Sequence, residues 1–214
     1  MATSLALSLV IGYFLGTIPI GILAGRAWAD IDPREAGSRN IGFTNVLRVA
    51  GKTAGAVTLI GDIGKGALAV LLSRLILGPA GGDWELAAGG AAILGHMFPV
   101  FLGFKGGKGV ATTLGVLLAA EPAIGGGILA VWLASAALWR TSSLAALVAL
   151  GSLPLWVWFF RPHAPMVGFT AAAIILIIYA HRDNISRIRA GTEPKFGTGA
   201  PVKDAEGRAA DTRI

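Results

Sequence analysis

The feature that most constrains this chain is a series of apolar segments that are almost free of charged residues. Seven of them lie at about residues 3–25, 54–77, 85–102, 110–120, 123–139, 143–160 and 165–180. A bilayer core about 30 Å thick is crossed by roughly 20 apolar residues in a helix. Only 14% of the 214 residues are charged, whereas soluble domains carry roughly a quarter. The sequence therefore predicts an all-α integral membrane protein.

A single polytopic domain is expected to cover residues 1–197. The first positive charge, Arg26, follows the first apolar run, whereas a secretory signal carries its positive charge before the run. This run is therefore expected to remain as a transmembrane helix. Residues 198–214 lack apolar periodicity and are predicted to form a disordered cytoplasmic tail.

The predicted topology depends on residues 110–139, which could form one long helix or two short helices separated at Glu121 and Pro122. Cytoplasmic loops carry an excess of Lys and Arg, and only two crossings place the basic first loop and the basic C-terminal region on the same side. This gives seven transmembrane helices, some of them short, with the N-terminus outside and the C-terminus inside. Three basic residues then lie outside the cytoplasmic set: Lys65, Arg74 and Arg161.

Composition excludes several kinds of site. The chain has no cysteine, so thiolate nucleophiles, disulfides and cysteine metal sites are ruled out. No HExxH pattern or paired His spacing occurs, and we expect neither a metal nor a cofactor. The formal charge of +6 falls between and after apolar segments, which indicates membrane topology and not nucleic-acid binding.

The first polar cluster is AGSRNIGFTNVLR, residues 36–48. Ser38, Asn40, Thr44 and Asn45 offer uncharged hydrogen-bonding groups, and Arg48 can hold a phosphate through two parallel N–H bonds. The cluster is interpreted as a phosphate-binding loop. A solvated loop with a helix cap is the alternative.

The second cluster is HMFPVFLGFKGGKGVATTLG, residues 96–115, with Lys105, Gly106, Gly107, Lys108 and Gly109 at the start of a predicted helix. Free backbone N–H groups, the positive end of a helix and two ammonium groups together favour an anion. The segment lacks the GxxxxGK[ST] pattern of a nucleotide P-loop. Topogenic lysines in a flexible turn are the alternative.

The third cluster is YAHRDNISRIRAGTEPKFG, residues 179–197, which carries His181, Asn184 and Glu193. A charged run after a last helix is also typical of an interfacial anchor. Asp62 and Lys65 stand three residues apart inside an apolar helix and can pair. Either structural pairing or a position in the wall of a site would explain them. The seven-helix arrangement places all three clusters on one side of the membrane.

In this order the three segments resemble the bacterial membrane-bound acyl-phosphate:glycerol-3-phosphate acyltransferases, the PlsY family. The resemblance extends from residue 4 to about residue 197 and rests on the motifs quoted above. Two positions depart from the family pattern: Arg39 stands where Gly is expected, and Phe43 where Ala is common. The HxxxxD pattern of acyl-CoA-dependent acyltransferases is absent.

The resemblance implies a seven-helix enzyme of the bacterial inner membrane, with its active site facing the cytoplasm. It would transfer an acyl group from acyl phosphate to the 1-hydroxyl of glycerol 3-phosphate, giving lysophosphatidic acid and phosphate. Membrane lipids and the enzyme that makes acyl phosphate are the other candidate partners. The competing class is a membrane transporter of a small organic anion, which also uses broken helices and glycine-rich turns. No internal repeat supports a transporter.

We expect three residues to act in catalysis: His181, Asn184 and Lys108. We expect the substrates to be bound by Ser38, Asn40, Thr44, Asn45, Arg48, Lys105, Gly106, Gly107 and Gly109. Asp62, Lys65 and Glu193 are expected to support these groups from behind. The base that takes the hydroxyl proton is either a phosphate oxygen of glycerol 3-phosphate or His181.

Overall fold

The computed structural model describes residues 1–196, apart from the side chain of Ala80, and the predicted tail at 198–214 lies outside these residues. All regular elements in the described part are helical. The α-helices are α1 (Ala2–Thr17), α2 (Ile20–Ala29), α3 (Phe43–Leu77), α4 (Trp84–Met97), α5 (Val110–Ala120), α6 (Pro122–Trp139), α7 (Ser142–Phe160), α8 (Ala164–Ala180) and α9 (Arg182–Arg189). Two short 3₁₀ helices, η1 (Gly78–Gly81) and η2 (Val100–Leu102), follow α3 and α4. The all-α class is therefore confirmed.

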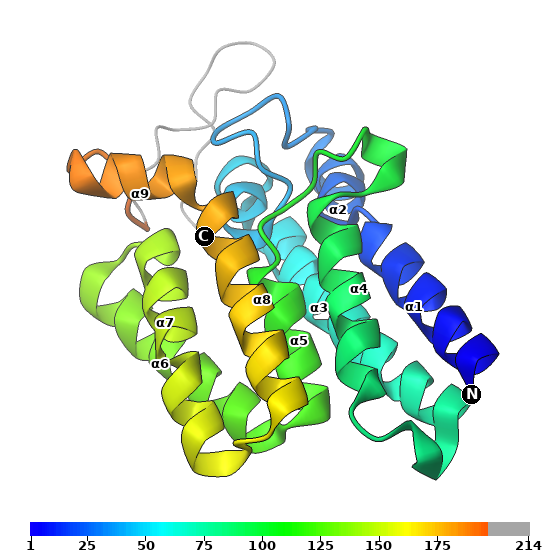
Figure 1. The fold of residues 1–214 in the computed structure, drawn as a ribbon. Coiled ribbons are helices and arrows are strands. Elements are labelled where there is room, and N and C mark those ends of the chain that lie inside the picture. Colours follow the sequence, from blue (N-terminus) through cyan, green and yellow to red (C-terminus); the bar gives the residue numbers. More distant parts are fainter. Residues whose placement is uncertain (197–214) are drawn as a thin grey trace.

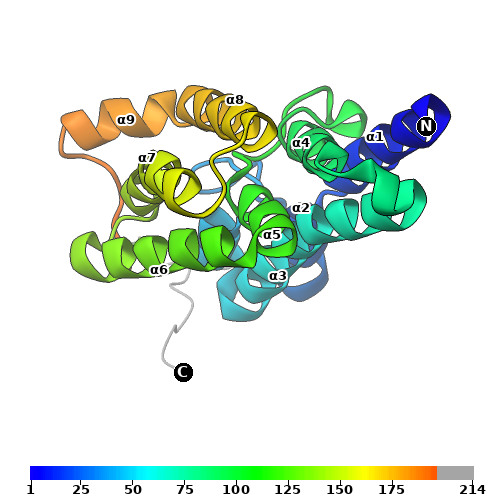
Figure 2. The same cartoon turned by 60° about the horizontal axis from the view of Figure 1, so that its bottom comes forward.

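Five helical stretches in the described part are long and apolar enough to cross a membrane, and α8 with α9 makes a sixth if the bent pair is counted as one span. The pair bends by 61°. Helix α5, with 11 residues, is about 16 Å long at 1.5 Å per residue. It lies between α3, α4 and α6 in the middle of the bundle, as Figure 2 shows. The short helix is therefore packed inside the protein, as its length predicts.

Residues 110–139 form two helices, α5 and α6, which separate at Glu121 and Pro122 as predicted. The helix predicted at residues 3–25 is interrupted at Ile18 and Pro19, because proline has no N–H group to continue the hydrogen-bond ladder. The helix predicted to start at residue 54 begins at Phe43 instead. The end of the first motif is consequently helical, and a kink at Gly51, with φ of +86°, separates it from the apolar part.

Glycine allows two pairs of helices to approach until backbones touch. A Cβ at Gly12 or Gly16 of α1 would overlap the carbonyl oxygens of Ala88 or Ala92 on α4. At the crossing of α3 with α5, a Cβ on Gly66 would overlap the carbonyl of Thr112. Lipid tails are as apolar as the side chains, so close packing of small residues is a main source of helix association in membranes.

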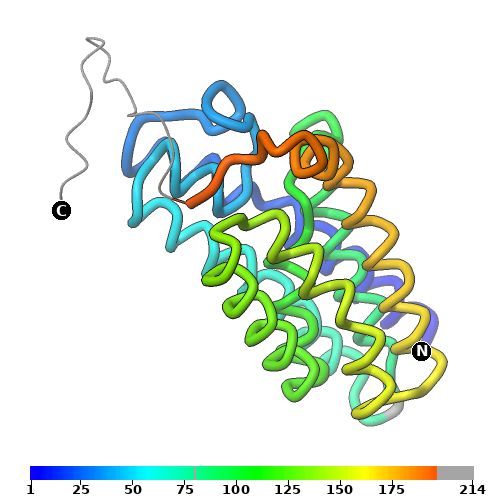
Figure 3. Tube along the Cα trace, turned by 90° about the vertical axis from the view of Figure 1, so that its left-hand side faces the viewer, coloured from blue at the N-terminus to red at the C-terminus, as the bar shows by residue number. Residues whose placement is uncertain are grey.

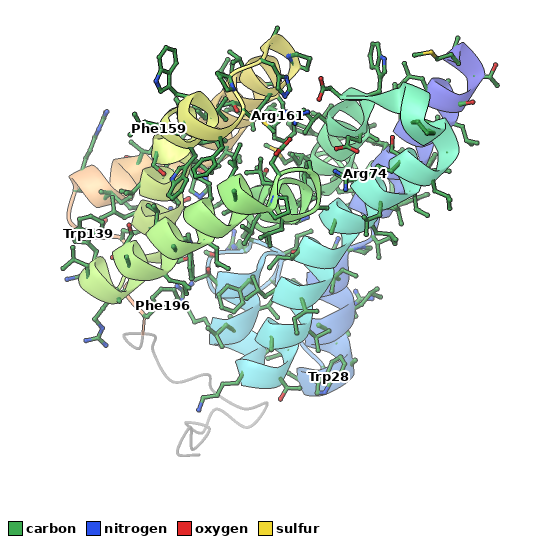
Figure 4. The ribbon with its side chains drawn as sticks, turned by 90° about the horizontal axis from the view of Figure 1, so that it is seen from below. Trp28, Arg74, Trp139, Phe159, Arg161 and Phe196 are labelled. Carbon is green, nitrogen blue, oxygen red and sulfur yellow. The ribbon has the colours of Figure 1, made fainter. Side chains whose placement is uncertain are left out.

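Ion pairs fasten the end of the bundle that lies at the bottom of Figure 1. Arg74 at the end of α3 pairs with Glu85 at the start of α4, and Arg161 after α7 lies 3.2 Å from Glu121. Figure 4, seen from below, shows Arg74 and Arg161 at this end. These contacts join α3, α4, the α5–α6 break and the α7–α8 connection.

The opposite end gathers the three polar segments of the sequence. The loop before α3, the glycine-rich loop before α5 and the α8–α9 junction all lie at the top of Figure 1, and Figure 3 shows them at the same end. The start of α1 lies at the bottom. Segments separated by more than 100 residues are therefore brought to one face of the bundle.

Candidate active site

Asn45 organises the first motif from the first turn of α3. Its side-chain oxygen accepts a hydrogen bond from the Ser38 N–H at 2.8 Å. Its amide nitrogen donates to the carbonyl oxygens of Pro33, Ala36 and Asn40 at 2.9–3.1 Å. Asn45 was predicted to bind substrate, but its side chain is buried and its polar groups already hold the loop. The structure therefore assigns it to shaping the loop.

The loop held by Asn45 presents the other residues of the motif. Ser38 is exposed on it, and the Asn40 side chain accepts a hydrogen bond from the Gly42 N–H at 2.9 Å. Arg39 has φ of +58°, a conformation that glycine adopts without steric cost. This geometry explains why Gly is expected at position 39. Thr44 shares a 2.7 Å hydrogen bond with Ser142 at the start of α7.

The glycine-rich loop folds back on the end of α4. The N–H groups of Gly106 and Gly107 donate to the carbonyl oxygens of Met97 and His96, each at 3.0 Å. The expectation that these two N–H groups are free for an anion is therefore wrong. A Cβ at Gly107 would overlap the His96 ring, and Gly109 begins α5 with φ of +81°. These glycines set the path of the loop, and the first turn of α5 supplies the unpaired helical N–H groups.

Lys108 belongs to a hydrogen-bond network that joins the second motif to the third. Its Nζ donates to the side-chain oxygen of Asn184 on α9. The Asn184 amide donates in turn to Glu193 at 2.6 Å. Ser143 of α7 and Arg187 of α9 each donate to the same carboxylate at 2.7 Å. The predicted grouping of Lys108, Asn184 and Glu193 in one cluster is thus present.

Two cations, Lys108 and Arg48, lie close enough for the charge of one to act on the other. Burial lowers the pKa of the Lys108 ammonium to about 8, and the positive charges of Arg187 and Arg48 act in the same direction against Glu193 and Asp183. Arg48 is half-buried, and its guanidinium has no hydrogen bond or ion pair with any described residue. A free guanidinium beside a desolvated ammonium is an arrangement that favours a phosphate between them.

Glu193 remains a carboxylate although it is partly buried. Burial opposes its ionisation, but hydrogen bonds from Ser143, Asn184 and Arg187 outweigh this effect and hold the pKa of Glu193 below its usual value. It accepts from three donors, which fixes the position of the Asn184 amide. Glu193 therefore holds the Asn184 amide that contacts Lys108, and its supporting role in the reaction stays a prediction.

His181 lies between α8 and α9 and is buried. Its Nδ1 lies 2.8 Å from the carbonyl oxygen of Ile177, and because a carbonyl only accepts, Nδ1 carries the proton. Burial and then the charge of Lys108 lower the pKa of His181 to about 4. The ring is therefore neutral at pH 7, with Nε2 as the unprotonated nitrogen.

Two groups of predicted residues lie apart from this network. Lys105 is exposed and makes no hydrogen bond or ion pair among the described residues. Asp62 and Lys65 pair at 2.8 Å as predicted, but inside α3. No cluster of three or more possible metal-binding side chains occurs in the part of the chain that the structure describes.

The sequence did not indicate four residues that complete the site. Ser142 and Ser143 begin α7 and contact Thr44 and Glu193, and Arg187 holds Glu193. Arg140 binds the segment after α9, since its guanidinium donates to the Phe196 carbonyl at 3.1 Å and its own carbonyl accepts the Phe196 N–H at 2.6 Å. Figure 4 shows Phe196 near Trp139 at the end of α6. No motif marks Ser142, Ser143 or Arg140, because their partners are distant in sequence, whereas Arg187 lies within the third cluster, six residues before Glu193.

Known proteins resemble this chain over most of its length. Residues 6–191 match the glycerol-3-phosphate acyltransferase family. The chain belongs to this family. A glycerol-3-phosphate acyltransferase from Jannaschia sp. (strain CCS1) is 51% identical over 196 residues, covering 92% of this chain and 95% of that protein. One from Caulobacter vibrioides (strain NA1000 / CB15N) is 48% identical over 204 residues, covering 94% and 92%.

Crystal structures of an integral membrane glycerol 3-phosphate acyltransferase, PlsY (YgiH), have the same fold. The glycerol 3-phosphate form superposes with a TM-score of 0.85 at 37% identity, covering 91% of this chain and 96% of that one. The lysophosphatidic acid form superposes with a TM-score of 0.83 at 36% identity and the same coverage. This glycerol-3-phosphate acyltransferase is therefore a multi-pass membrane protein with the PlsY fold.

Proposed function

We propose that the protein transfers a fatty acyl group from acyl phosphate to the 1-hydroxyl of glycerol 3-phosphate, the first step of phospholipid synthesis. The products are 1-acylglycerol 3-phosphate and inorganic phosphate. The observation that carries this proposal is the proximity of two cations: the Arg48 guanidinium, which has no hydrogen bond or ion pair among the described residues, acts electrostatically on the Lys108 ammonium. Two phosphorylated substrates require cations of this kind, and one substrate also requires an apolar path for its chain.

An apolar groove of about 540 Å³ provides such a path between α1, α4 and α8. Ile93 lines this groove, and its side chain would lie 3.2 Å from a Cβ built on Gly109, so a wall of the groove contacts the glycine-rich loop. Leu176 lines the same groove on α8, just before the junction that carries His181. The proposed acyl chain lies in this groove, with its phosphate at Lys108.

Within the proposed reaction the glycerol 1-hydroxyl attacks the acyl carbonyl directly. The carbon–oxygen bond to phosphate breaks, phosphate leaves with the electron pair, and the hydroxyl proton passes to a base. An acyl phosphate is already activated, so positioning and charge stabilisation are the main requirements. The base is a phosphate oxygen of glycerol 3-phosphate or, alternatively, the neutral His181 ring.

We assign the acyl-phosphate head to Ser38, Asn40, Arg48 and Lys108, and the phosphate of glycerol 3-phosphate to Asn184 and His181. Lys105 is exposed in the same loop and is proposed to attract the anion from solution. No metal or nucleotide takes part in this proposal.

The proposed setting is the bacterial inner membrane, with seven crossings, the N-terminus outside and the site facing the cytoplasm. An odd number of crossings is supported by Figure 1, in which α1 starts at one end of the bundle and α9 lies at the opposite end. Counting α5 and α8 as crossings completes the seven. The enzyme that makes acyl phosphate is then a candidate partner at the cytoplasmic face.

The deciding experiment incubates purified protein with palmitoyl phosphate and glycerol 3-phosphate and measures lysophosphatidic acid. Formation of this product without added metal or nucleotide is expected, and palmitoyl-CoA should not replace the donor. Turnover with palmitoyl-CoA alone would contradict the proposed donor. Absence of product, together with glycerol 3-phosphate uptake into proteoliposomes, would support the transporter of a small organic anion instead.

A further inference from the structure

Three ionisable side chains lie inside the helix bundle, away from the network around Lys108. Lys65 and Asp62 of α3 are 2.8 Å apart, and His96 Nδ1 of α4 lies 3.5 Å from the same Asp62 oxygen. Their exposures are 6%, 2% and 4%. Ionisable groups at such depth are costly and usually have a defined role.

At one end, this row of three side chains contacts the break between α1 and α2. Lys65 Nζ donates to the carbonyl oxygen of Ile18 at 3.1 Å. That carbonyl lies between α1 and α2, where Pro19 supplies no N–H. Lys65 thereby adds a second hydrogen bond to this carbonyl, which also accepts the Ile20 N–H at 3.0 Å.

At the other end of the row, His96 contacts the glycine-rich loop. The His96 carbonyl accepts the Gly107 N–H at 3.0 Å. The His96 ring fills the space where a Cβ on Gly107 would lie. His96 Nδ1 has no hydrogen-bond partner among the described residues, so the nearby Asp62 charge is the interaction that orients the ring. Lys108 is the next residue after Gly107.

We propose that Lys65, Asp62 and His96 are positioning residues that hold the glycine-rich loop so that the Lys108 ammonium faces Asn184 and the substrate phosphate. This inference rests on the proposed function. The Asp62 carboxylate orients the His96 ring, the ring and its carbonyl fix Gly107, and Gly107 sets the direction of Lys108. None of the three touches the reacting atoms.

The test uses variants that keep the interior filled. His96→Gln retains a polar side chain of similar length, and the double variant Asp62→Leu/Lys65→Met replaces the ion pair by apolar residues. Such a replacement of a buried pair is often neutral for stability, whereas removal of one partner is not. Ser73→Ala is the matched control, because Ser73 is a buried polar residue of α3 that does not belong to the group of Lys65, Asp62 and His96.

We expect both variants to lower kcat/KM by about 10- to 100-fold, as a displacement of about 1 Å at a reacting group does. Ser73→Ala should remain within about twofold of the wild type. Thermal unfolding in detergent shows whether a loss of activity comes only from loss of the folded state. Activity equal to Ser73→Ala in both variants would overturn the inference while leaving the proposed function intact.

Competitive acetylation of lysines provides a readout that does not depend on catalysis. In the wild type Lys108 should titrate near pH 8, and the acetylation of the exposed Lys105 in the same loop serves as an internal control for access of the reagent. In both variants the titration of Lys108 should move to higher pH, because the released ammonium reaches water. An unchanged Lys108 titration in folded protein would overturn the inference, even if activity falls. No product from the wild type would instead refute the proposed function.

Discussion

Two side chains, Lys108 and Arg48, supply the positive charge on which the proposed reaction depends. A hydrogen bond to a charged group contributes roughly 1.5–3 kcal/mol, and each 1.36 kcal/mol changes a rate about tenfold. Lys108→Ala and Arg48→Ala are therefore each expected to lower kcat/KM by at least about tenfold, and by about a hundredfold if the contact strengthens as phosphate leaves. Initial rates over a range of both substrates measure this.

Arg48→Lys should restore only part of the activity, because an ammonium cannot form two parallel bonds to a phosphate. Arg189→Ala is the control, since Arg189 is exposed on α9 and makes no hydrogen bond or ion pair with a described residue. Arg140 is unsuitable for this purpose because it binds Phe196. Equal losses in Arg189→Ala and Arg48→Ala would show that general surface charge is responsible.

The lowered pKa of Lys108, about 8, makes activity depend on pH in a defined direction. Lys108 acts as a cation, so kcat/KM should be constant below pH 8 and fall about tenfold per pH unit above it. A bound phosphate favours the charged ammonium, so the corresponding fall in kcat should occur at higher pH. In Lys108→Arg this alkaline limb should disappear, because a guanidinium stays protonated. An unchanged limb in that variant would assign it to another group.

At the scale of elements, glycines decide how closely helices pack. Gly64 and Gly66 lie two residues apart on α3, but a Cβ on Gly66 would overlap the Thr112 carbonyl of α5 while a Cβ on Gly64 would meet nothing within 4 Å. Gly66→Ala is expected to destabilise the protein by about 1–3 kcal/mol through overpacking. Gly64→Ala should be neutral or stabilise it by up to about 1 kcal/mol, because alanine favours helix.

Unfolding of the two variants in detergent, followed by circular dichroism, measures this difference. The two substitutions are chemically identical and belong to the same helix, so they differ only in their neighbours. If Gly66→Ala is as stable as Gly64→Ala, the close crossing of α3 with α5 is not as described. Since Lys108 lies two residues before the start of α5, the same substitution should also reduce activity.

At the scale of the whole molecule, the proposed topology predicts which surface each polar segment faces. The chain has no cysteine, so the labelling of a single introduced cysteine shows which side of the membrane that position faces. Ser38→Cys and Ser186→Cys, both at exposed positions, should react with a membrane-impermeant maleimide only after the inner membrane is opened. Pro162→Cys, exposed after α7 at the other end, should react in intact spheroplasts. Labelling of position 186 from outside would refute the seven-crossing topology.

The class of the protein could be predicted from the sequence, and its candidate site residues could be selected there. Apolar segments with few charges leave a helical membrane protein as the only folding solution, because unpaired backbone groups cannot remain in lipid. Lys108, Arg48, Asn184 and Glu193 could be selected because charges and amides in such a chain are rare enough to be informative. The separation at Glu121 and Pro122 followed from the distribution of positive charge.

The contacts among these residues became visible only in the folded structure. In it, Asn45 holds the first loop, and the N–H groups of Gly106 and Gly107 donate to backbone carbonyls. Ser143 and Arg187 donate to Glu193. The folded structure also places His96 between Asp62 and Gly107. The physical reason is that hydrogen bonds between residues far apart in sequence depend on helix directions and close crossings. Local patterns of hydrophobicity and charge do not specify helix directions or close crossings.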